Sequence, residues 1–390
     1  MNYPLADIKI LSLAEQYPGP YATLILSDLG ADVILVERPS GGDPARQFPA
    51  FFESLNRNKR SVALDLKSEE GRSALLRLVQ DADVFLEGFR PGTMERIGFG
   101  YEAVSAVNRR IVYASISGFG QDGPYRDRPA HDLSYQATAG MLHEFAESGR
   151  TGPLSQLATG DLSSGMFAAI AVLVGLLTRE KTGEGSYIDV SMTDGLVSWM
   201  TSQLVPVMNS TGPAGVLHEP GYGIYRTADG KLISLSIAHE DYFWQSLCRV
   251  LGMEDVASLR GSERLERRDE LTARMEKALV SRPRDEWVGI FDAEGIPFGP
   301  VYQLEEVPGD PHVKARQLIV ELPPNGLRPA RRHVRQPIRM KGFEDGPRRH
   351  APELGEHTQE VLRGAGFSEK ELKAMFESKA AFDSSSSPGT

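Results

Sequence analysis

The chain has 390 residues and carries 43 Lys and Arg against 53 Asp and Glu, which gives a formal net charge of −10. This acidic balance argues against a protein that coats nucleic acid, because such proteins are basic. A single cysteine, Cys248, excludes an internal disulfide framework and a multi-cysteine zinc site. The first residues lack a signal-peptide pattern, and the most apolar run, 166–177, is too short to span a bilayer. We therefore expect a multidomain cytoplasmic enzyme that contacts neither nucleic acid nor a membrane.

Strand and helix patterns alternate through the first 120 residues. Short apolar and β-branched runs predict strands, and longer runs between them predict helices, one of them capped by Ser68. The expected strands are 8–11, 32–36, 61–65, 83–86 and 111–115, and the expected helices are 21–29, 69–80 and 101–107. Strands separated by helices are typical of βαβ units, so the sequence predicts an α/β fold with a largely parallel sheet.

The rest of the chain changes character near residue 210, where Gly and Pro become frequent. Before this point we expect a helix at 162–179, a strand at 186–190 and a helix from Asp194. After it we expect a hairpin at 225–233 that turns on Asp229-Gly230, helices at 240–252 and 262–281, a strand at 334–340 and a helix at 358–364. The predicted domains are 1–210 (large α/β domain), 211–330 (small domain), 331–383 (return to the large domain) and 384–390 (disordered tail).

A glycine pattern at 118–123 matches G-x-G-x-x-G and follows an expected strand. In a dinucleotide site this pattern opens a helix whose N-terminus holds the pyrophosphate. Here Pro124 and Pro129 follow the glycines and forbid that helix. The pattern therefore predicts a loop.

Two acidic positions and one histidine are the candidates for chemistry. His131-Asp132 ends the loop after an expected strand, where open α/β sheets place their sites, although a loop histidine beside a carboxylate is also commonplace. Asp161 precedes the long helix, so it could be only an N-cap. The small residues around it (Gly160, 163–165) instead suggest clearance for a bulky substrate.

His239-Glu240 follows the predicted hairpin, where acidic residues could simply begin the next helix. The sequence contains neither H-E-x-x-H nor G-x-S-x-G, so we predict no metal and no serine nucleophile. Cys248, on the inner face of the helix predicted after Glu240, is expected to be a core residue and not a nucleophile.

Basic residues recur at the ends of the expected strands. Solvated surface charge is the ordinary explanation, but their clustering in successive loops also suits a ligand with several phosphates. The residues are Arg38, Arg57, Lys59, Arg60, Arg90, Arg126 and Arg128.

Taken together, residues 5–375 resemble the class III CoA-transferase (CaiB/BaiF) superfamily, which includes carnitine and formyl CoA-transferases and α-methylacyl-CoA racemases. The similar stretches are PGPYATLILSDLGADVILVERPSGGD, LNRNKRSVALDLK, FLEGFRPGTMERIGFGYE, RIVYASISGFGQDGPY, AHDLSYQATAG, TGDLSSGMFAA, REKTGEGSYIDVSMTDG, YRTADGKLISLSI, EGIPFGPVY and HAPELGEHTQEVL.

The resemblance implies a large Rossmann-like parallel-sheet domain plus a smaller α+β domain, in an interlocked homodimer whose sites lie between domains of different chains. It places Asp161 on the active-site aspartate. It also implies an acyl-CoA substrate held near Arg38, Lys59 or Arg60, Arg90 and Arg128, and no cofactor beyond the coenzyme A of that thioester.

Two reactions share this scaffold. In the racemases two groups exchange the α-proton of a 2-methylacyl-CoA, whereas in the transferases the aspartate attacks the thioester. His131-Asp132, Pro18-Gly19-Pro20 and LEGFRPGTMERIG resemble the racemases, with Asp161 as the second proton carrier and Glu240 (or His239) as a further acid. Gln136-Ala137 resembles the transferases. The sequence therefore favours the racemase, with the CoA-transferase as the alternative and an inactive acyl-CoA-binding protein as a minor one.

Overall fold

The computed structural model describes residues 2–143, 157–211, 219–326 and 328–384. The chain divides into two compact units, one made of Met1–Thr201 and Gln317–Thr390 and the other of Ser202–Arg316. The two boundaries fall somewhat before positions 210 and 330, where the change of composition placed them. Apart from Ser384, the tail expected to be disordered lies outside the described residues.

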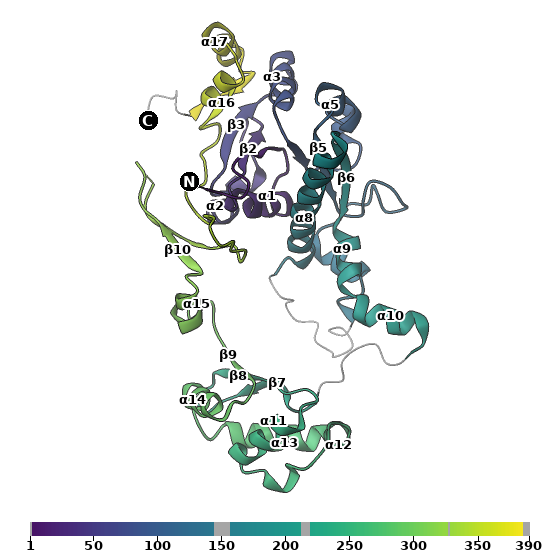
Figure 1. The fold of residues 1–390 in the computed structure, drawn as a ribbon, viewed down its shortest axis with the longest axis vertical. Coiled ribbons are helices and arrows are strands. Elements are labelled where there is room, and N and C mark those ends of the chain that lie inside the picture. The colour runs from purple at the N-terminus through teal and green to yellow at the C-terminus, as the bar shows by residue number, and fades with distance from the viewer. Residues whose placement is uncertain (1, 144–156, 212–218, 327, 385–390) are drawn as a thin grey trace. The chain divides into compact units, whose positions relative to one another are not determined.

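The first unit alternates strands and helices along most of its length (Figure 1). Its elements are β1 (Lys9–Ser12), α1 (Pro18–Asp28), β2 (Asp32–Glu37), α2 (Pro49–Asn56), β3 (Arg60–Leu64), α3 (Glu69–Gln80), β4 (Val84–Glu87), α4 (Thr93–Arg96), α5 (Tyr101–Val107), β5 (Val112–Ser117), α6 (Asp132–Thr138), α8 (Thr159–Thr182), β6 (Ser186–Ser191), α9 (Met192–Trp199), α10 (Thr201–Asn209, which runs into the second unit), β10 (Ile319–Leu322), β11 (Arg331–Val334), α16 (Thr358–Gly364), α17 (Glu369–Glu377) and β12 (Ala381–Phe382).

Seven strands form one sheet in the order β12-β3-β2-β1-β4-β5-β6. Every neighbouring pair is parallel except β12 with β3. The order of the six parallel strands is that of a doubly wound nucleotide-binding fold, and it reverses between β1 and β4. The prediction of an α/β fold with a largely parallel sheet is confirmed.

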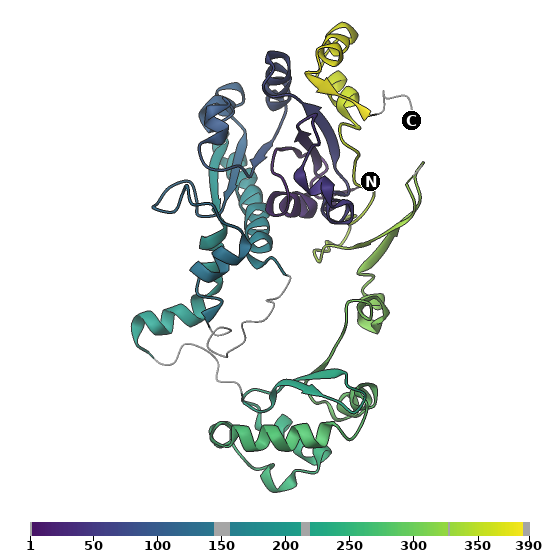
Figure 2. The ribbon, with the colours of Figure 1, turned by 180° about the vertical axis from the view of Figure 1, so that it is seen from behind.

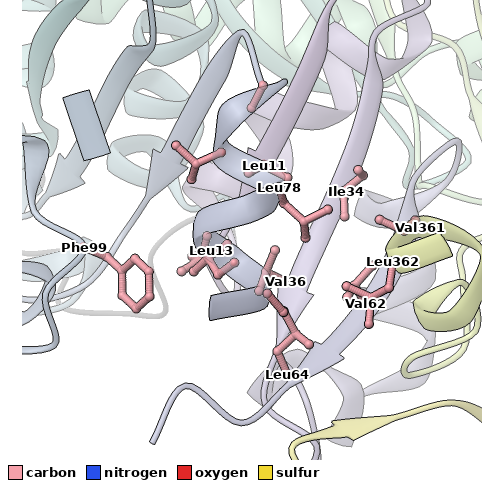
Figure 3. Packing of buried hydrophobic residues seen from close by; sticks show 14 of the residues in the cluster. Leu11, Leu13, Ile34, Val36, Val62, Leu64, Leu78, Phe99, Val361 and Leu362 are labelled. Atoms are coloured by element: carbon pink, nitrogen blue, oxygen red, sulfur yellow. The ribbon is translucent and has the colours of Figure 1, made fainter. Parts of the chain in front are cut away.

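Helices cover both faces of this sheet (Figure 2). Alternate strand residues point to opposite faces, so Leu11 and Ile34 pack with α3, α16 and α17, whereas Ile10 and Val33 pack with α1 and α8. Figure 3 shows the first of these cores. Because both faces are buried, the strands are almost continuously apolar, and this pattern made them predictable.

The helix α8 is 24 residues long, and its most apolar window has a mean hydropathy of 1.8. By length and composition it could cross a membrane, so the expectation that this apolar segment is too short was wrong. Small and weakly polar residues extend the apolar run on its N-terminal side (162–165), whereas charged residues follow Thr178 on the other side. In the structure one face of α8 packs on α1, β5 and β6.

The second unit contains a three-stranded antiparallel sheet of β7 (Tyr222–Arg226), β8 (Leu232–Ser236) and β9 (Phe298–Val301). Its helices are α11 (Asp241–Leu251), α12 (Gly261–Glu266), α13 (Arg268–Leu279), α14 (Arg284–Glu294) and α15 (Pro311–Ala315). The hairpin pairs Tyr225 with Ile233, as expected, and Gly230 adopts the positive φ that its turn needs. Cys248 is fully buried in the core of this unit, also as expected.

Two local expectations can be compared directly with the structure. No helix follows the glycines at 118–123 until Asp132, which confirms the loop. The strand predicted at 334–340 is wrong: β11 ends at Val334, and residues 335–340 form no strand. The backbone turns at Gln336, because the side-chain oxygen of Gln336 accepts a hydrogen bond from the Ile338 amide at 2.6 Å.

A buried ion pair joins distant parts of the first unit. Arg57 donates to both carboxylate oxygens of Asp28, at 3.0 and 2.5 Å, and also to the Val334 carbonyl at 2.8 Å. Asn58 adds a hydrogen bond to Asp28 and another to the Gly346 carbonyl. The end of α1, the start of β3 and the C-terminal segment are therefore held at one point.

Removing one partner of this pair leaves the other as an unpaired buried charge. We expect Arg57→Ala to lower the free energy of unfolding by roughly 3–5 kcal/mol. The control is Arg109→Ala, because Arg109 is 81% exposed and pairs with Glu184 at the surface, where such pairs contribute about 0–1 kcal/mol. Urea denaturation of both variants measures the difference, and an equal, small loss would show that the buried pair is not a structural anchor.

Candidate active site

A cavity of about 900 Å³ lies at the carboxyl edge of the sheet, beside the point where the strand order reverses. Loops after β1, β4 and β5 line it, together with the starts of α6 and α8. Open α/β sheets bind ligands at such switch points, because the loops on either side diverge there. The cavity brings together His131, Asp132, Asp161, Arg90 and Arg128, which the sequence had singled out separately.

The carboxylate of Asp132, at the start of α6, closes the N-terminus of α8. Its Oδ1 accepts hydrogen bonds from the backbone amides of Gly160 at 2.6 Å and Asp161 at 3.3 Å. Gln136, one turn further along α6, donates to the other oxygen at 2.5 Å. Asp132 thereby gives a hydrogen-bond acceptor to amides that a helix N-terminus leaves without an intrahelical partner.

Asp161 lies in the first turn of α8, and its side chain borders the cavity. The interpretation of Asp161 as an N-cap is wrong, because α8 begins at Thr159 and Asp132 takes the free amides. Among the described residues, no donor reaches the Asp161 carboxylate. Burial, and then the charge of Asp132, raise the pKa of Asp161 to about 7. A carboxylate in this state is poorly stabilised and therefore reactive.

The two glycines near Asp161 are required by packing within the protein, and not by clearance for a bulky substrate as the sequence suggested. A Cβ at Gly160 would lie 2.9 Å from the Asp132 carboxylate, and a Cβ at Gly165 would lie 2.7 Å from the Pro18 carbonyl on α1. Gly160 therefore admits the carboxylate that closes the helix, and Gly165 lets α1 and α8 pack closely. Neither glycine is explained by clearance for substrate.

His131 is the residue that precedes α6, and its side chain is exposed in the cavity. The next turn is fixed by Tyr135, whose hydroxyl donates to the Ala130 carbonyl at 2.9 Å. His131 and Asp161 thus line one cavity, as a racemase that uses both as proton carriers requires, whereas a transferase needs only Asp161 there.

The basic residues separate into two groups. Arg90 and Arg128 line the cavity, and the guanidinium of Arg128 lies 3.7 Å from the centre of the Tyr125 ring. Arg126 also lines it, but its Nε donates to the Gln121 carbonyl and it pairs with Asp127. Arg38 is exposed on the loop after β2.

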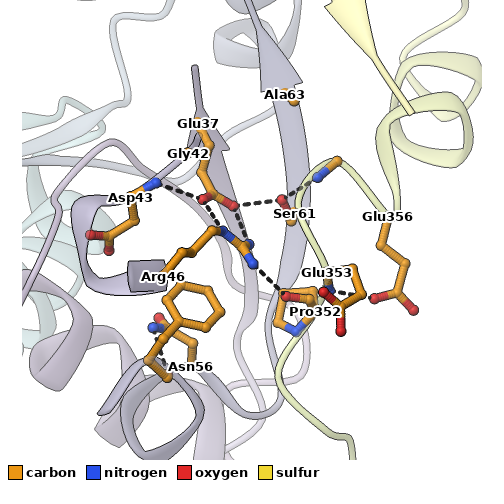
Figure 4. A network of polar contacts seen from close by, with 12 residues as sticks. Glu37, Gly42, Asp43, Arg46, Asn56, Ser61, Ala63, Pro352, Glu353 and Glu356 are labelled. Carbon is orange, nitrogen blue, oxygen red and sulfur yellow. Dashed lines mark hydrogen bonds and ion pairs between the residues drawn. The ribbon is translucent and has the colours of Figure 1, made fainter. Parts of the chain in front are cut away.

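That loop is held by a polar network around Glu37, at the end of β2 (Figure 4). Arg46 donates to both oxygens of Glu37 at 2.7 Å, and the Asp43 amide and the Ser61 hydroxyl add further hydrogen bonds. Arg46 also donates to the Pro352 carbonyl, which ties the loop to the C-terminal segment.

Lys59 and Arg60 do not face the cavity, which corrects the expectation that they contact CoA. Lys59 is completely buried, and its ammonium donates to the Pro20 carbonyl and to Asn56. Burial holds the pKa of Lys59 well below its usual range. Arg60 begins β3, at the opposite edge of the sheet, and pairs with Asp32 and Glu360. Arg57 is likewise committed to the buried pair with Asp28.

Glu240 and His239 belong to the second unit. Glu240 precedes α11, and its carboxylate accepts from the Ala238 amide at 3.1 Å. Backbone hydrogen bonds hold the pKa of Glu240 below its usual range, so it is ionised at neutral pH.

Two further carboxyl groups near the cavity were missed from the sequence. Glu15 follows β1 and lines the cavity, and burial, with the neighbouring Asp43, raises its pKa to about 7. Glu87 ends β4 beneath the cavity-lining Gly88, and burial raises its pKa to about 7 as well. Both residues could have been found from the sequence, because they lie at or just after the ends of β1 and β4, the two strands on either side of the switch point.

The raised pKa of Asp161 predicts a stability cost that grows with pH. An acid whose pKa is higher in the folded state loses stabilisation as the pH rises from its unfolded to its folded pKa. Asp161→Asn should therefore stabilise the fold little near pH 4 and by up to roughly 4 kcal/mol at pH 8. The control is Asp127→Asn, at an exposed carboxyl on the same cavity. Urea denaturation between pH 4 and 8 tests this, and a gain independent of pH would contradict the assignment.

Comparison with known proteins identifies the family of this chain. The family model described as CoA-transferase family III matches residues 5–358. An acyl-CoA transferase of Fusarium pseudograminearum is 34% identical over 93% of this chain and 85% of its own length. An acetyl-CoA:oxalate CoA-transferase of Acetobacter aceti is 32% identical over 90% of this chain and 93% of its own.

A solved structure has the same fold. The crystal structure of a CaiB/BaiF family protein from Brucella suis matches with a TM-score of 0.84 and 30% sequence identity, over 94% of this chain and all of that one. The family resemblance seen in the sequence is thereby confirmed. The chain belongs to CoA-transferase family III and is an enzyme of CoA thioesters.

Proposed function

We propose that the protein is a CoA-transferase that moves CoA from an acyl-CoA to a carboxylic acid, with Asp161 as the nucleophile. The observation that carries this proposal is the Asp161 carboxylate itself. It borders the cavity without a hydrogen-bond donor among the described residues, while Asp132 occupies the helix amides that would otherwise stabilise it. The names of the two curated relatives, both of them transferases, favour this reaction over the racemisation that the sequence favoured.

The reaction consists of four acyl transfers. A carboxylate oxygen of Asp161 attacks the thioester carbonyl, the C–S bond breaks, and CoA leaves as a thiolate from a mixed anhydride. The thiolate then attacks the aspartyl carbonyl of the anhydride, which releases the donor acid as a carboxylate and leaves an aspartyl-CoA thioester. The acceptor carboxylate attacks that thioester to give a second anhydride and free thiolate. Attack of this thiolate on the acceptor carbonyl forms the new acyl-CoA and restores Asp161.

Arg90 and Arg128 are the residues that we assign to the phosphates of CoA. Both line the cavity, and a guanidinium matches the geometry of a phosphate. Arg38 is a third candidate, because it is exposed on a loop at the same edge of the sheet. No cofactor other than the CoA of the substrate is required by this chemistry.

Racemisation of a 2-methylacyl-CoA is the second candidate function. It is favoured by one observation, that His131 and Asp161 line the same cavity and could serve as two proton carriers. Glu240, proposed from the sequence as a further acid, is a poor proton donor at neutral pH, because its hydrogen bonds favour the ionised form.

We also propose that the chain acts as a homodimer in the cytoplasm. The apolar residues Met166, Ile170, Val174 and Leu177 recur at helical spacing along α8 and are 43–67% exposed in the single chain. Such a stripe is typical of a surface that a second chain covers.

The test supplies a single-enantiomer 2-methylacyl-CoA in deuterated buffer, with and without added carboxylic acids. We expect a new CoA ester only when an acid is present, and no deuterium at the α-carbon. We expect His131→Ala to retain most of this transfer, whereas loss of a positioned proton carrier would cost a racemase about 10²–10⁴-fold.

Mass spectrometry of the CoA esters measures both outcomes. Asp161→Asn is the control, because it removes the group that either mechanism needs. Deuterium uptake without an acceptor acid, lost in His131→Ala, would replace the transferase with the racemase. CoA-thioester binding without either reaction would identify an inactive binding protein.

A further inference from the structure

Three potential metal ligands meet in the first unit, outside the candidate active site. They are Glu53 on α2, His333 on β11 and His350 in the segment after it. One ring nitrogen of each histidine and one carboxylate oxygen of Glu53 all lie within 4.8 Å of one another. Two imidazoles and one carboxylate are the protein ligands of one common class of zinc site.

The ring of His333 has an unmet bonding requirement. The residue is only 6% exposed, and its Nε2 is buried with no hydrogen-bond partner among the described residues. A buried polar atom without a partner costs about 1–3 kcal/mol, so native structures contain few of them. Coordination of a metal ion by this nitrogen would remove the cost.

The ring of His350 is oriented as in many metal sites. Its Nε2 lies 2.8 Å from the Pro323 carbonyl, which can only accept, so Nε2 carries the proton. In the neutral ring, Nδ1 then keeps the lone pair that a metal needs. Metal-binding histidines commonly donate their other ring N–H to a backbone carbonyl in this way, and the contact fixes both the tautomer and the ring.

The surroundings provide both access and a competitor. Glu53 and His350 line a surface cavity of about 460 Å³, which Arg46 and Pro352 also border (Figure 4 shows both). The competitor is Arg331, whose Nε donates to the two oxygens of Glu53 at 2.9 and 3.0 Å. Its side chain is 46% exposed, so it can move into solvent when a cation replaces it.

We propose that Glu53, His333 and His350 bind one zinc-class divalent cation, which displaces Arg331 from Glu53. Donor atoms around zinc lie about 2.0–2.2 Å from the metal, so three donor atoms that lie within 4.8 Å of one another are close enough to share one ion. The ion would fasten the N-terminal half of the sheet domain to the C-terminal segment. This proposal departs from the expectation of a protein without metal. That expectation rested on local motifs, whereas these ligands are far apart in the sequence.

The test uses the untagged full-length chain, stripped with a chelator and titrated with Zn²⁺ or with Co²⁺ as a spectroscopic probe. We expect one ion per chain, visible absorption from coordinated Co²⁺ and a raised melting temperature with Zn²⁺. His333→Gln and His350→Gln should each weaken binding by about tenfold or more. The matched control is His312→Gln, at an exposed histidine in the second unit, which should leave the affinity unchanged.

Arg331→Gln provides a test that does not require a ligand to be removed. It takes away the competing cation, so it should strengthen Zn²⁺ binding several-fold, and this result would hold even if a histidine variant failed to fold. Less than one ion per chain, equal affinity in His333→Gln and His312→Gln, or no gain in Arg331→Gln would each overturn the site. These readouts are independent of CoA transfer, so the proposed reaction can fail without affecting them.

Discussion

The hydrogen bonds from the Gly160 and Asp161 amides to the carboxylate of Asp132 determine what Asp161 can do. A helix N-terminus offers amides and positive potential to an anion, and Asp132 receives both from the neighbouring helix α6. Asp161 is left half-buried beside a negative charge, and for this reason its pKa rises to about 7. The two neighbouring carboxyl groups therefore differ: Asp132 accepts from the helix amides, and Asp161 is left without such donors and is reactive. The absence of a side chain at Gly160 makes this arrangement possible.

The sheet brings this pair of carboxyl groups to the cavity at its carboxyl edge. Because the strand order reverses between β1 and β4, the loops that carry Glu15 and Arg90 diverge at the carboxyl edge, and the loop after β5 delivers His131 and Asp132 to the same space. Elsewhere in the same unit, the buried pair of Arg57 and Asp28 holds the end of α1, the start of β3 and the C-terminal segment together. The charged groups of the candidate site and those of the buried ion pair thus occupy separate parts of one unit.

Local sequence patterns predicted much of this fold, but not the partners of its charged residues. The helix at 69–80, its Ser68 cap and the buried strands follow from periodicity within a few residues. Lys59 belongs to the same basic cluster as Arg90, yet it is buried against the Pro20 carbonyl, because its environment is set by α1 rather than by its neighbours in sequence. For the same reason the sequence alone left open whether Asp161 caps α8, since the residue that accepts from the first amides of that helix lies 29 positions before Asp161. Contacts of this kind depend on the tertiary fold, and single-sequence patterns do not contain them.

We propose that Asp161 carries CoA during turnover, and trapping of the covalent intermediate tests this role most directly. The chain is mixed with an acyl-CoA donor and no acceptor, quenched in acid, digested and analysed by mass spectrometry. We expect the peptide with Asp161 to gain the mass of CoA less one water. Glu15→Gln should still form this adduct, and Asp161→Asn should not. An adduct on another residue, or transfer by Asp161→Asn at the normal rate, would contradict this role.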